Sequence, residues 1–141
     1  MTFNEYIDFE VHELTSDVME IRVPVKEEYE NELGGVHGGA IMLVADAATG
    51  LLAIDRKYLA PTQSSYTNFL RPISMDSKYI YARAEVIKRG RRTVTIDCKV
   101  WGDDGKLAAV NRTECTVISD DVENNPTKLI KSFQDGTYKK Y

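Results

Sequence analysis

Alternating apolar and polar positions divide much of the chain into short segments typical of β-strands. Two of them lie near the N-terminus, at residues 6–14 and 18–25, and two more lie at residues 78–88 and 93–101. Two further strands are predicted at residues 62–70, which carry several Thr and Ser residues, and at residues 106–118, which follow a hairpin turn. Successive side chains of a strand point to opposite faces, so the alternation predicts strands with one buried face and one polar face. The sequence Gly-Asp-Asp-Gly at residues 102–105 predicts a hairpin turn between the last two strands.

The stretch between these two groups has a different pattern. Residues 40–54 are fifteen almost wholly apolar residues rich in Ala, Leu, Ile and Met, which predicts a helix. The stretch is too short to cross a bilayer, and a helix that is apolar on every side is a buried one. Its side chains able to form hydrogen bonds are Asp46 and Thr49, three positions apart and therefore expected on one face.

The order of elements predicts an α+β fold in which an antiparallel sheet of five or six strands wraps around one long buried helix. One small sheet cannot cover such a helix on every side. We therefore expect a second copy of the chain to cover the remaining flank.

Asp46 is unusual in this setting because an ionised carboxylate is rarely buried without a partner. We expect it to lie in a dry pocket, where a carboxylate serves in proton transfer or nucleophilic attack. The alternative is a structural Asp that bonds nearby backbone or reaches solvent.

A glycine-rich turn precedes the helix. Gly34 and Gly35 permit a sharp turn, and Gly38 and Gly39 stand where the helix begins. The first N–H groups of a helix have no intrahelical partner, and the helix dipole favours negative charge beside them. Such N–H groups can polarise a carbonyl and hold an oxyanion. The alternative is a tight loop-to-helix junction without chemistry.

Asn31, His37-Gly38-Gly39 and Asp46, nine positions after the histidine, resemble a pattern of the hot-dog-fold acyl-CoA thioesterases. The similarity is greatest to the phenylacetyl-CoA and 4-hydroxybenzoyl-CoA thioesterase group and covers approximately residues 5–118. It continues in three further motifs, at residues 68–72, 88–92 and 103–107.

The resemblance implies a hot-dog fold and the hydrolysis of an acyl- or aryl-acyl-CoA to free acid and coenzyme A. It assigns the polarising N–H to Gly38 and makes Asp46 the base or the nucleophile. Asn31 would orient water or substrate, and Thr62 stands where some relatives place a helper hydroxyl. His37 would brace the turn or act near the thiol, or only cap the turn. No metal and no cofactor are expected, because coenzyme A is part of the substrate.

Helix geometry constrains how such a site is assembled. Nine helical residues between His37 and Asp46 correspond to a rise of about 13.5 Å and a rotation of about 180°. Asp46 is therefore expected to meet the oxyanion donors of a partner helix, and the resemblance also implies a site shared between subunits. Hot-dog subunits pair their sheets edge to edge and many stack again, so a homodimer or homotetramer is expected.

Four basic residues, Lys88, Arg89, Arg91 and Arg92, flank Gly90 between two predicted strands. Arg binds phosphate in a bidentate manner, so this turn is a candidate site for the phosphates of coenzyme A. The alternative is an ordinary solvated turn.

Length and composition narrow the remaining possibilities. The 141 residues suit one domain, and a net charge of −4 argues against nonspecific nucleic-acid binding. The N-terminus lacks a basic-then-apolar pattern and no apolar run is long, so we expect no signal peptide, no membrane span and a cytoplasmic location. Cys98 and Cys115 lack metal-type spacing and are expected to be free, packed thiols.

We expect a single thioesterase-like domain at residues 1–118 and a polar extension at 119–141, with a short helix at 127–134. Two other functions stay open: an acyl-thioester hydratase or dehydratase of the same fold, and a non-catalytic acyl-CoA-binding module. Hydratases of this fold usually place a catalytic His differently, and the chain has only His12, expected on a polar strand face, and His37. Asp46 argues against a binding module.

Overall fold

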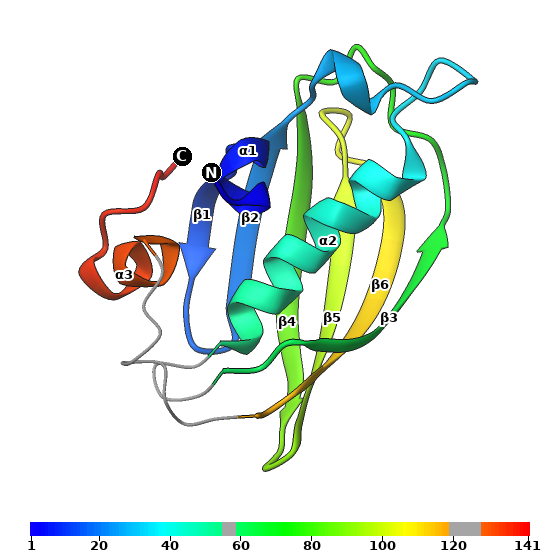
Figure 1. Cartoon of the computed structure of the whole chain (residues 1–141). Helices are drawn as coiled ribbons and strands as arrows, with labels where there is room; N and C mark the ends of the chain where they lie inside the picture. The colour runs from blue at the N-terminus through cyan, green and yellow to red at the C-terminus, as the bar shows by residue number, and fades with distance from the viewer. Residues whose placement is uncertain (55–58, 119–127) are drawn as a thin grey trace.

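The computed structural model describes residues 1–54, 59–118 and 128–141. Six strands form one antiparallel sheet in the order β1-β2-β4-β5-β6-β3, and a long helix lies across one of its faces (Figure 1). The strands are β1 (Glu10–Leu14), β2 (Val18–Pro24), β3 (Thr62–Phe69), β4 (Tyr79–Arg89), β5 (Thr93–Trp101) and β6 (Leu107–Thr116). The helices are α1 (Phe3–Ile7), the short 3-10 helix η1 (Glu27–Tyr29), α2 (Gly38–Ala53) and α3 (Lys128–Asp135). The predicted α+β architecture is confirmed.

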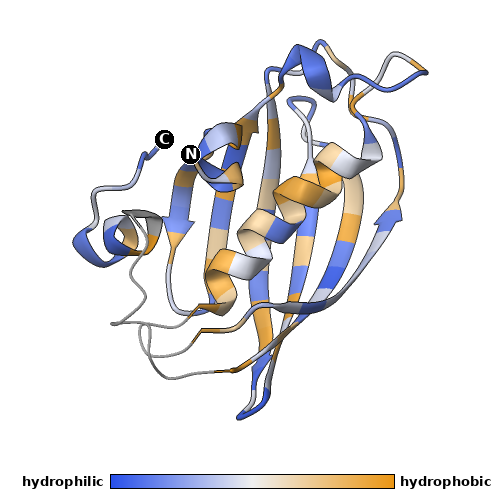
Figure 2. Cartoon of the chain, viewed as in Figure 1, coloured by the Kyte–Doolittle hydropathy of each residue, from blue (hydrophilic) through white to orange (hydrophobic). Residues whose placement is uncertain are grey.

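The core lies between α2 and the face of the sheet beneath it. Apolar residues line α2 and alternate along the central strands, as Figure 2 shows. Ala82 and Ala84 of β4 are fully buried, and small side chains at these positions let the helix pack closely on the sheet. Cys98 and Cys115 are free and buried, as expected. Burial raises the pKa of the Cys98 thiol to about 12, and it raises the pKa of Cys115 as well.

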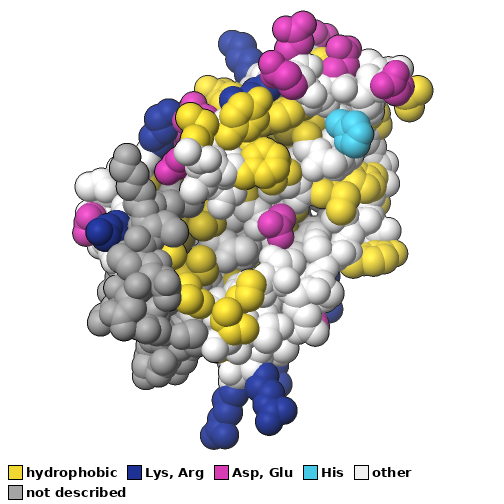
Figure 3. Space-filling view, in the orientation of Figure 1, with side chains coloured by type: hydrophobic (Ala, Val, Ile, Leu, Met, Phe, Trp, Pro, Cys, Tyr) yellow, Lys and Arg dark blue, Asp and Glu magenta, His cyan; other side chains and the backbone are white. Residues whose placement is uncertain are grey.

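The helix is not buried on every side of a single chain. One flank stays open: Met42 is 43% exposed, and Asp46 one turn further on is also exposed. On the face shown in Figure 3, hydrophobic and uncharged side chains surround an acidic one. The expectation that Asp46 and Thr49 share a face is wrong, because Thr49 is fully buried and its hydroxyl donates to the Ala45 carbonyl.

The two edges of the sheet differ. The edge of β1 is covered by the C-terminal residues, since Val11 N–H donates to the Lys139 carbonyl at 2.8 Å and its carbonyl accepts from Tyr141 N–H at 3.1 Å. At the other edge β3 pairs only with β6 among the described strands, and nearly all of its residues are exposed. An exposed edge strand is a template for pairing with another chain.

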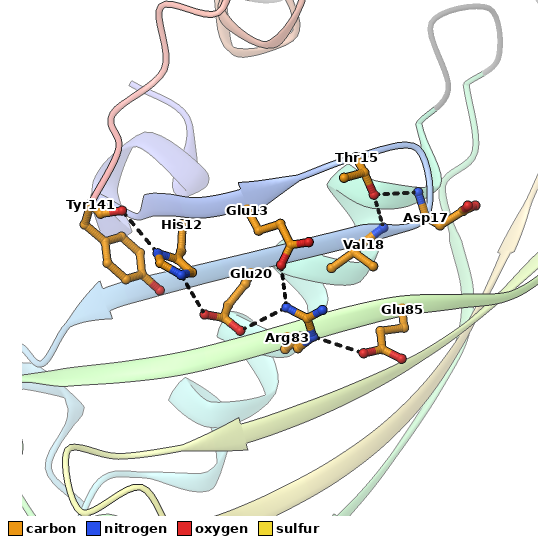
Figure 4. Close-up of polar contacts among 9 residues, drawn as sticks. All are labelled: His12, Glu13, Thr15, Asp17, Val18, Glu20, Arg83, Glu85 and Tyr141. Atoms are coloured by element: carbon orange, nitrogen blue, oxygen red, sulfur yellow. Dashed lines mark hydrogen bonds and ion pairs between the residues drawn. The ribbon is translucent and has the colours of Figure 1, made fainter.

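The outer face of the sheet carries charged side chains (Figure 4). Arg83 of β4 forms ion pairs with Glu13 at 2.7 Å and Glu20 at 3.2 Å. His12 lies beside this cluster on β1, where its Nε2 is 4.0 Å from Glu20 and its Nδ1 is 3.2 Å from the Tyr141 carbonyl oxygen. The prediction that His12 is a polar-face residue is confirmed.

The first predicted strand is partly wrong. Phe3–Ile7 form α1, whose start is fixed by a capping box: Thr2 Oγ1 accepts from Glu5 N–H, and the Glu5 carboxylate accepts from Thr2 N–H. Asp8 then takes a left-handed φ of 56°, and β1 begins at Glu10. Alternation of apolar residues before Glu10 therefore reflects packing of a helical turn, not a longer strand.

The predicted C-terminal helix is found as α3, which begins at Lys128. Thr127, where the prediction began, lies outside the described residues together with the rest of 119–127. Within the described part of the chain, no helix combines the length and the apolarity that crossing a membrane requires.

Candidate active site

Asp46 lies on the open flank of α2, facing strand β3. Its Oδ1 accepts a hydrogen bond from Thr62 Oγ1 at 2.9 Å. The structure thus brings together two predicted site residues from different elements. The expectation of a dry pocket is wrong for a single chain, because the sheet covers only one side of α2 and both Asp46 and Thr62 are exposed.

Asn31 organises the glycine-rich turn. Its Oδ1 accepts from the backbone N–H groups of Leu33 at 2.9 Å and Gly35 at 3.0 Å. Gly34, inside the turn, has a φ of 82°, which glycine adopts without strain. The side-chain oxygen of Asn31 is therefore engaged within its own turn, whereas no described residue accepts a hydrogen bond from its Nδ2.

His37 is the N-cap of α2, and Gly38 is the first helical residue. His37 Nδ1 accepts from Gly39 N–H at 2.8 Å, and its carbonyl accepts from Ala40 N–H at 2.9 Å. Within the described part of the chain, the Gly38 N–H has no acceptor. A free N–H at the positive end of a helix dipole is suited to hold a developing oxyanion.

Strand β3 contacts α2 at two places, near Asp46 and near Gly38. Thr62, at its start, contacts Asp46, and Phe69, at its end, lies beside Gly38, where an added Cβ would come 3.3 Å from the ring. Gly38 and Asp46 are eight residues apart in α2, a rise of about 12 Å. Reacting atoms must approach to about 3–3.5 Å, so one carbonyl cannot reach both groups of a single chain.

The predicted basic turn lies at the opposite end of α2 from Gly38. Figure 3 shows Lys and Arg side chains projecting where the β4–β5 hairpin turns. Lys88, Arg91 and Arg92 are exposed, as the candidate phosphate-binding role requires. Gly90 closes the turn through its N–H, which donates to the Thr93 carbonyl at 2.9 Å.

Arg89 differs from its neighbours because its guanidinium turns back to the end of α2. It donates to the carbonyls of Ala53 at 3.1 Å, Leu52 at 3.3 Å and Ser16 at 2.9 Å. The last carbonyls of a helix have no intrahelical partner, and α2 has no basic residue in its last turn. The lack of a basic residue there indicates from sequence that a donor to the last carbonyls of α2 must come from another element, although it does not identify Arg89.

Comparison with known proteins supports the family assignment. The family model of the thioesterase superfamily matches residues 33–109, more than half of the chain. A protein of Saccharolobus solfataricus with the provisional name of an esterase is 29% identical over 107 residues, which are 74% of this chain and 75% of that protein.

Two solved structures share the fold. The PaaI protein from the phenylacetic acid degradation operon of E. coli has a TM-score of 0.77 at 20% identity, over 82% of this chain and 83% of that one. The smu.793 protein of Streptococcus mutans, solved with acetyl CoA bound, has a TM-score of 0.75 at 21% identity, over 80% of this chain and 90% of that one. The expected hot-dog fold is confirmed, and the chain belongs to the thioesterase superfamily.

Proposed function

We propose that the protein hydrolyses acyl-CoA thioesters to the free acid and coenzyme A. The observation that carries the proposal is the Asp46 carboxylate, held by the Thr62 hydroxyl at the open flank of the central helix. The bound acetyl CoA in the S. mutans relative supports a coenzyme A thioester as the ligand.

In the proposed reaction, Asp46 takes a proton from water as the water oxygen attacks the thioester carbon, or attacks that carbon itself. The carbonyl oxygen becomes an oxyanion, to which the Gly38 N–H donates. The C–S bond then breaks, and the sulfur takes the proton that Asp46 removed from water and leaves as the thiol of coenzyme A. If Asp46 attacks directly, the sulfur leaves as a thiolate and a mixed anhydride forms on Asp46; water then hydrolyses the anhydride, which releases the free acid, restores the carboxylate and supplies the proton of the thiol. Thr62 orients Asp46 by donating to Oδ1, which leaves Oδ2 for the reacting water. Asn31 and His37 hold the turn that presents Gly38.

We propose that two copies of the chain pair through β3 and share each site. Tyr66, Phe69 and Leu70 at or beside this edge are 68%, 50% and 56% exposed, whereas the C-terminal residues cover the opposite edge. Antiparallel pairing places two α2 helices side by side in opposite directions. Asp46 of one copy then approaches Gly38 of the other, which removes the separation found within one chain.

The same arrangement gives a role to the basic turn. It lies beyond the C-terminal end of α2, and the N-terminal end of a partner helix running the opposite way lies on that side. Lys88, Arg91 and Arg92 would therefore bind the phosphates of coenzyme A near a shared site, with Gly90 permitting their close approach. Arg89, whose guanidinium is engaged by three carbonyls, would support the turn.

Replacing Asp46 tests the proposal. Asp46→Asn keeps the side-chain shape but removes the base or nucleophile, so release of thiol from acyl-CoA should fall by about 10²-fold or more. Asp97→Asn is the matched control, because Asp97 pairs with Arg112 on strands β5 and β6 away from α2.

Binding and product analysis separate the competing functions. Asp46→Asn should still bind a non-hydrolysable acyl-CoA analogue in calorimetry. An unchanged rate of thiol release by Asp46→Asn would contradict the mechanism. Acyl-CoA bound by the wild-type protein without thiol release would indicate a binding module, and hydration of an enoyl-CoA would indicate a hydratase.

A further inference from the structure

Four polar side chains form a network on the inner face of β3 and β6, the face that also carries Thr62 and Phe69. Asn111 Nδ2 donates to Ser65 Oγ at 2.9 Å and to Thr67 Oγ1 at 2.8 Å. Asn111 Oδ1 accepts from Thr113 Oγ1 at 2.7 Å. Asn111 and Thr113 are buried, so the network sits where the sheet otherwise presents apolar side chains to α2.

Among the described residues, the network leaves the hydroxyl proton of Thr67 without an acceptor. With the Asn111 amide in this orientation, its two N–H groups are both used by the hydroxyl oxygens of Ser65 and Thr67. Each of these hydroxyls must then direct its own proton elsewhere. Thr113 Oγ1, which donates to Asn111 Oδ1, lies 3.3 Å from Ser65 Oγ, and Thr67 has no acceptor among the described residues. The Thr67 O–H is therefore available to donate a hydrogen bond to a ligand, and the Ser65 O–H is a second, weaker candidate.

These two hydroxyls lie between Thr62, which contacts Asp46, and Phe69, which lies beside Gly38 of the same chain. On β6, the partners of Thr62, Ser65 and Thr67 follow one another at every second residue, Cys115, Thr113 and Asn111. A strand rises about 3.4 Å per residue, so Ser65 lies about 7 Å and Thr67 about 14 Å along the sheet from Thr62. Ser65 is exposed and Thr67 half-buried in the single chain. An acyl group extending from the thioester along β3 toward Phe69 would pass both hydroxyls.

We propose that the acyl group carries a hydrogen-bond-accepting oxygen remote from the thioester, which the hydroxyls of Thr67 and Ser65 bind. The inference rests on the proposed acyl-CoA hydrolysis and specifies its substrate class as oxygenated acyl groups. A purely aliphatic acyl group would desolvate these hydroxyls without replacing their hydrogen bonds to water. A site built to hydrogen-bond a substrate oxygen discriminates strongly against analogues that lack it.

The test compares matched substrates that differ only in the oxygen. Dodecanoyl-CoA with a keto group at carbon 5, 8 or 11 is paired with dodecanoyl-CoA that has a methyl group at the same carbon. Because the two groups have similar size, we expect kcat/KM to favour the ketone by about tenfold or more in at least one pair. The preferred position reports the distance from the thioester to the hydroxyls.

Variants then assign the preference to the network. Thr67→Val removes the hydroxyl at nearly constant shape and should lower the ketone-to-methyl ratio toward one, and Ser65→Ala provides a second, independent variant. Thr116→Val is the control, because Thr116 lies on the same strand pair but its hydroxyl donates to Gln63 at 2.6 Å. A merely structural network would lower both rates together and leave the ratio unchanged.

The outcomes separate this inference from the proposed function. Hydrolysis of both members of every pair at equal rates would overturn the inference and leave the thioesterase proposal standing. A ketone preference that survives in both Thr67→Val and Ser65→Ala would also overturn it. Hydrolysis of no acyl-CoA by the wild-type protein would overturn both.

Discussion

Gly38 contributes a backbone N–H to the proposed site, so the usual side-chain truncation cannot test it. The local backbone offers another route, because Gly38 is the first residue of α2, a position that favours proline. His37 has φ −59° and ψ 136°, the extended conformation that a residue before proline prefers. Proline at position 38 would therefore remove the N–H donor while preserving the start of the helix.

We expect Gly38→Pro to lower kcat/KM by about 10²–10³-fold, the effect typical of losing one oxyanion donor. Gly38→Ala is the matched control, because it adds the same Cβ near the Phe69 ring but retains the N–H, and its loss should be much smaller. Steady-state kinetics of both variants, with circular dichroism to verify folding, measures the difference. Equal losses in the two variants would mean that the Phe69 contact, and not the N–H, matters.

The chemical types of the candidate residues could be predicted from sequence, but not all of their surroundings. The spacing of Gly38 and Asp46 placed both on one helix, and the Thr62 hydroxyl does contact Asp46. The engagement of Asn31 Oδ1 by its own turn could not be predicted, because turn hydrogen bonds depend on the φ of Gly34. Nor did the sequence place Asn111 beside Thr67, since that contact needs the register of β3 on β6.

At the scale of elements, alternation predicted the strands that have one buried face, such as β2, β4 and β5. It failed at α1, where Thr2 and Glu5 form a capping box and Ile7, the last residue of the helix, is buried. The pattern of apolar and polar positions also does not predict contacts between the ends of elements. Arg89 joins the end of β4 to the end of α2 and to the β1–β2 turn, although it belongs by sequence to the basic turn.

Arg89→Met should therefore lower the stability of the fold, whereas replacing its exposed neighbour Arg91 should weaken substrate binding. Methionine keeps an apolar stem but loses the hydrogen bonds to Ser16, Leu52 and Ala53, so the free energy of unfolding should fall by about 1.5–3 kcal/mol in urea titrations. Arg91→Met, at an exposed position, should leave stability nearly unchanged but raise KM for acyl-CoA. A truncated pantetheine thioester should show no such rise in KM. A loss of stability in Arg91→Met together with a raised KM and unchanged stability in Arg89→Met would contradict these roles.

At the scale of the whole molecule, the buried thiols report on the packing of the core. Burial raises the pKa of Cys98 to about 12 and also raises that of Cys115. A raised thiol pKa favours the neutral form in the folded state. The corresponding stability is present below the ordinary thiol pKa of about 8.5 and is lost as pH rises above it, where thiols of the unfolded chain ionise.

We accordingly expect both thiols to be nearly inert toward a disulfide reagent such as DTNB at about pH 8 in the native protein, since the thiolate is the reactive form. Unfolding in guanidinium chloride should release two reactive thiols per chain within the mixing time. Rapid labelling of the native protein would show that the sheet opens beneath α2 more readily than its packing indicates.

The whole molecule also shows why the sequence overestimated the burial of Asp46. An apolar stretch indicates that a helix is covered, but it does not state how many chains cover it. In a single chain the sheet covers one side of α2 and leaves Met42 and Asp46 exposed. The proposed dimer assigns the missing cover to a second copy and places each Asp46 beside the Gly38 of its partner.

Mixed refolding of two inactive variants tests that shared site most directly. Gly38→Pro and Asp46→Asn are unfolded together and refolded, with each variant refolded alone and the wild-type protein refolded as controls. If each site takes Gly38 from one chain and Asp46 from the other, a mixed dimer has one site with both defects and one intact site. Random pairing makes about half of the dimers mixed, so about a quarter of wild-type thiol release should return. A mixture that stays as inactive as its two components, while the wild-type control recovers, would contradict the shared site.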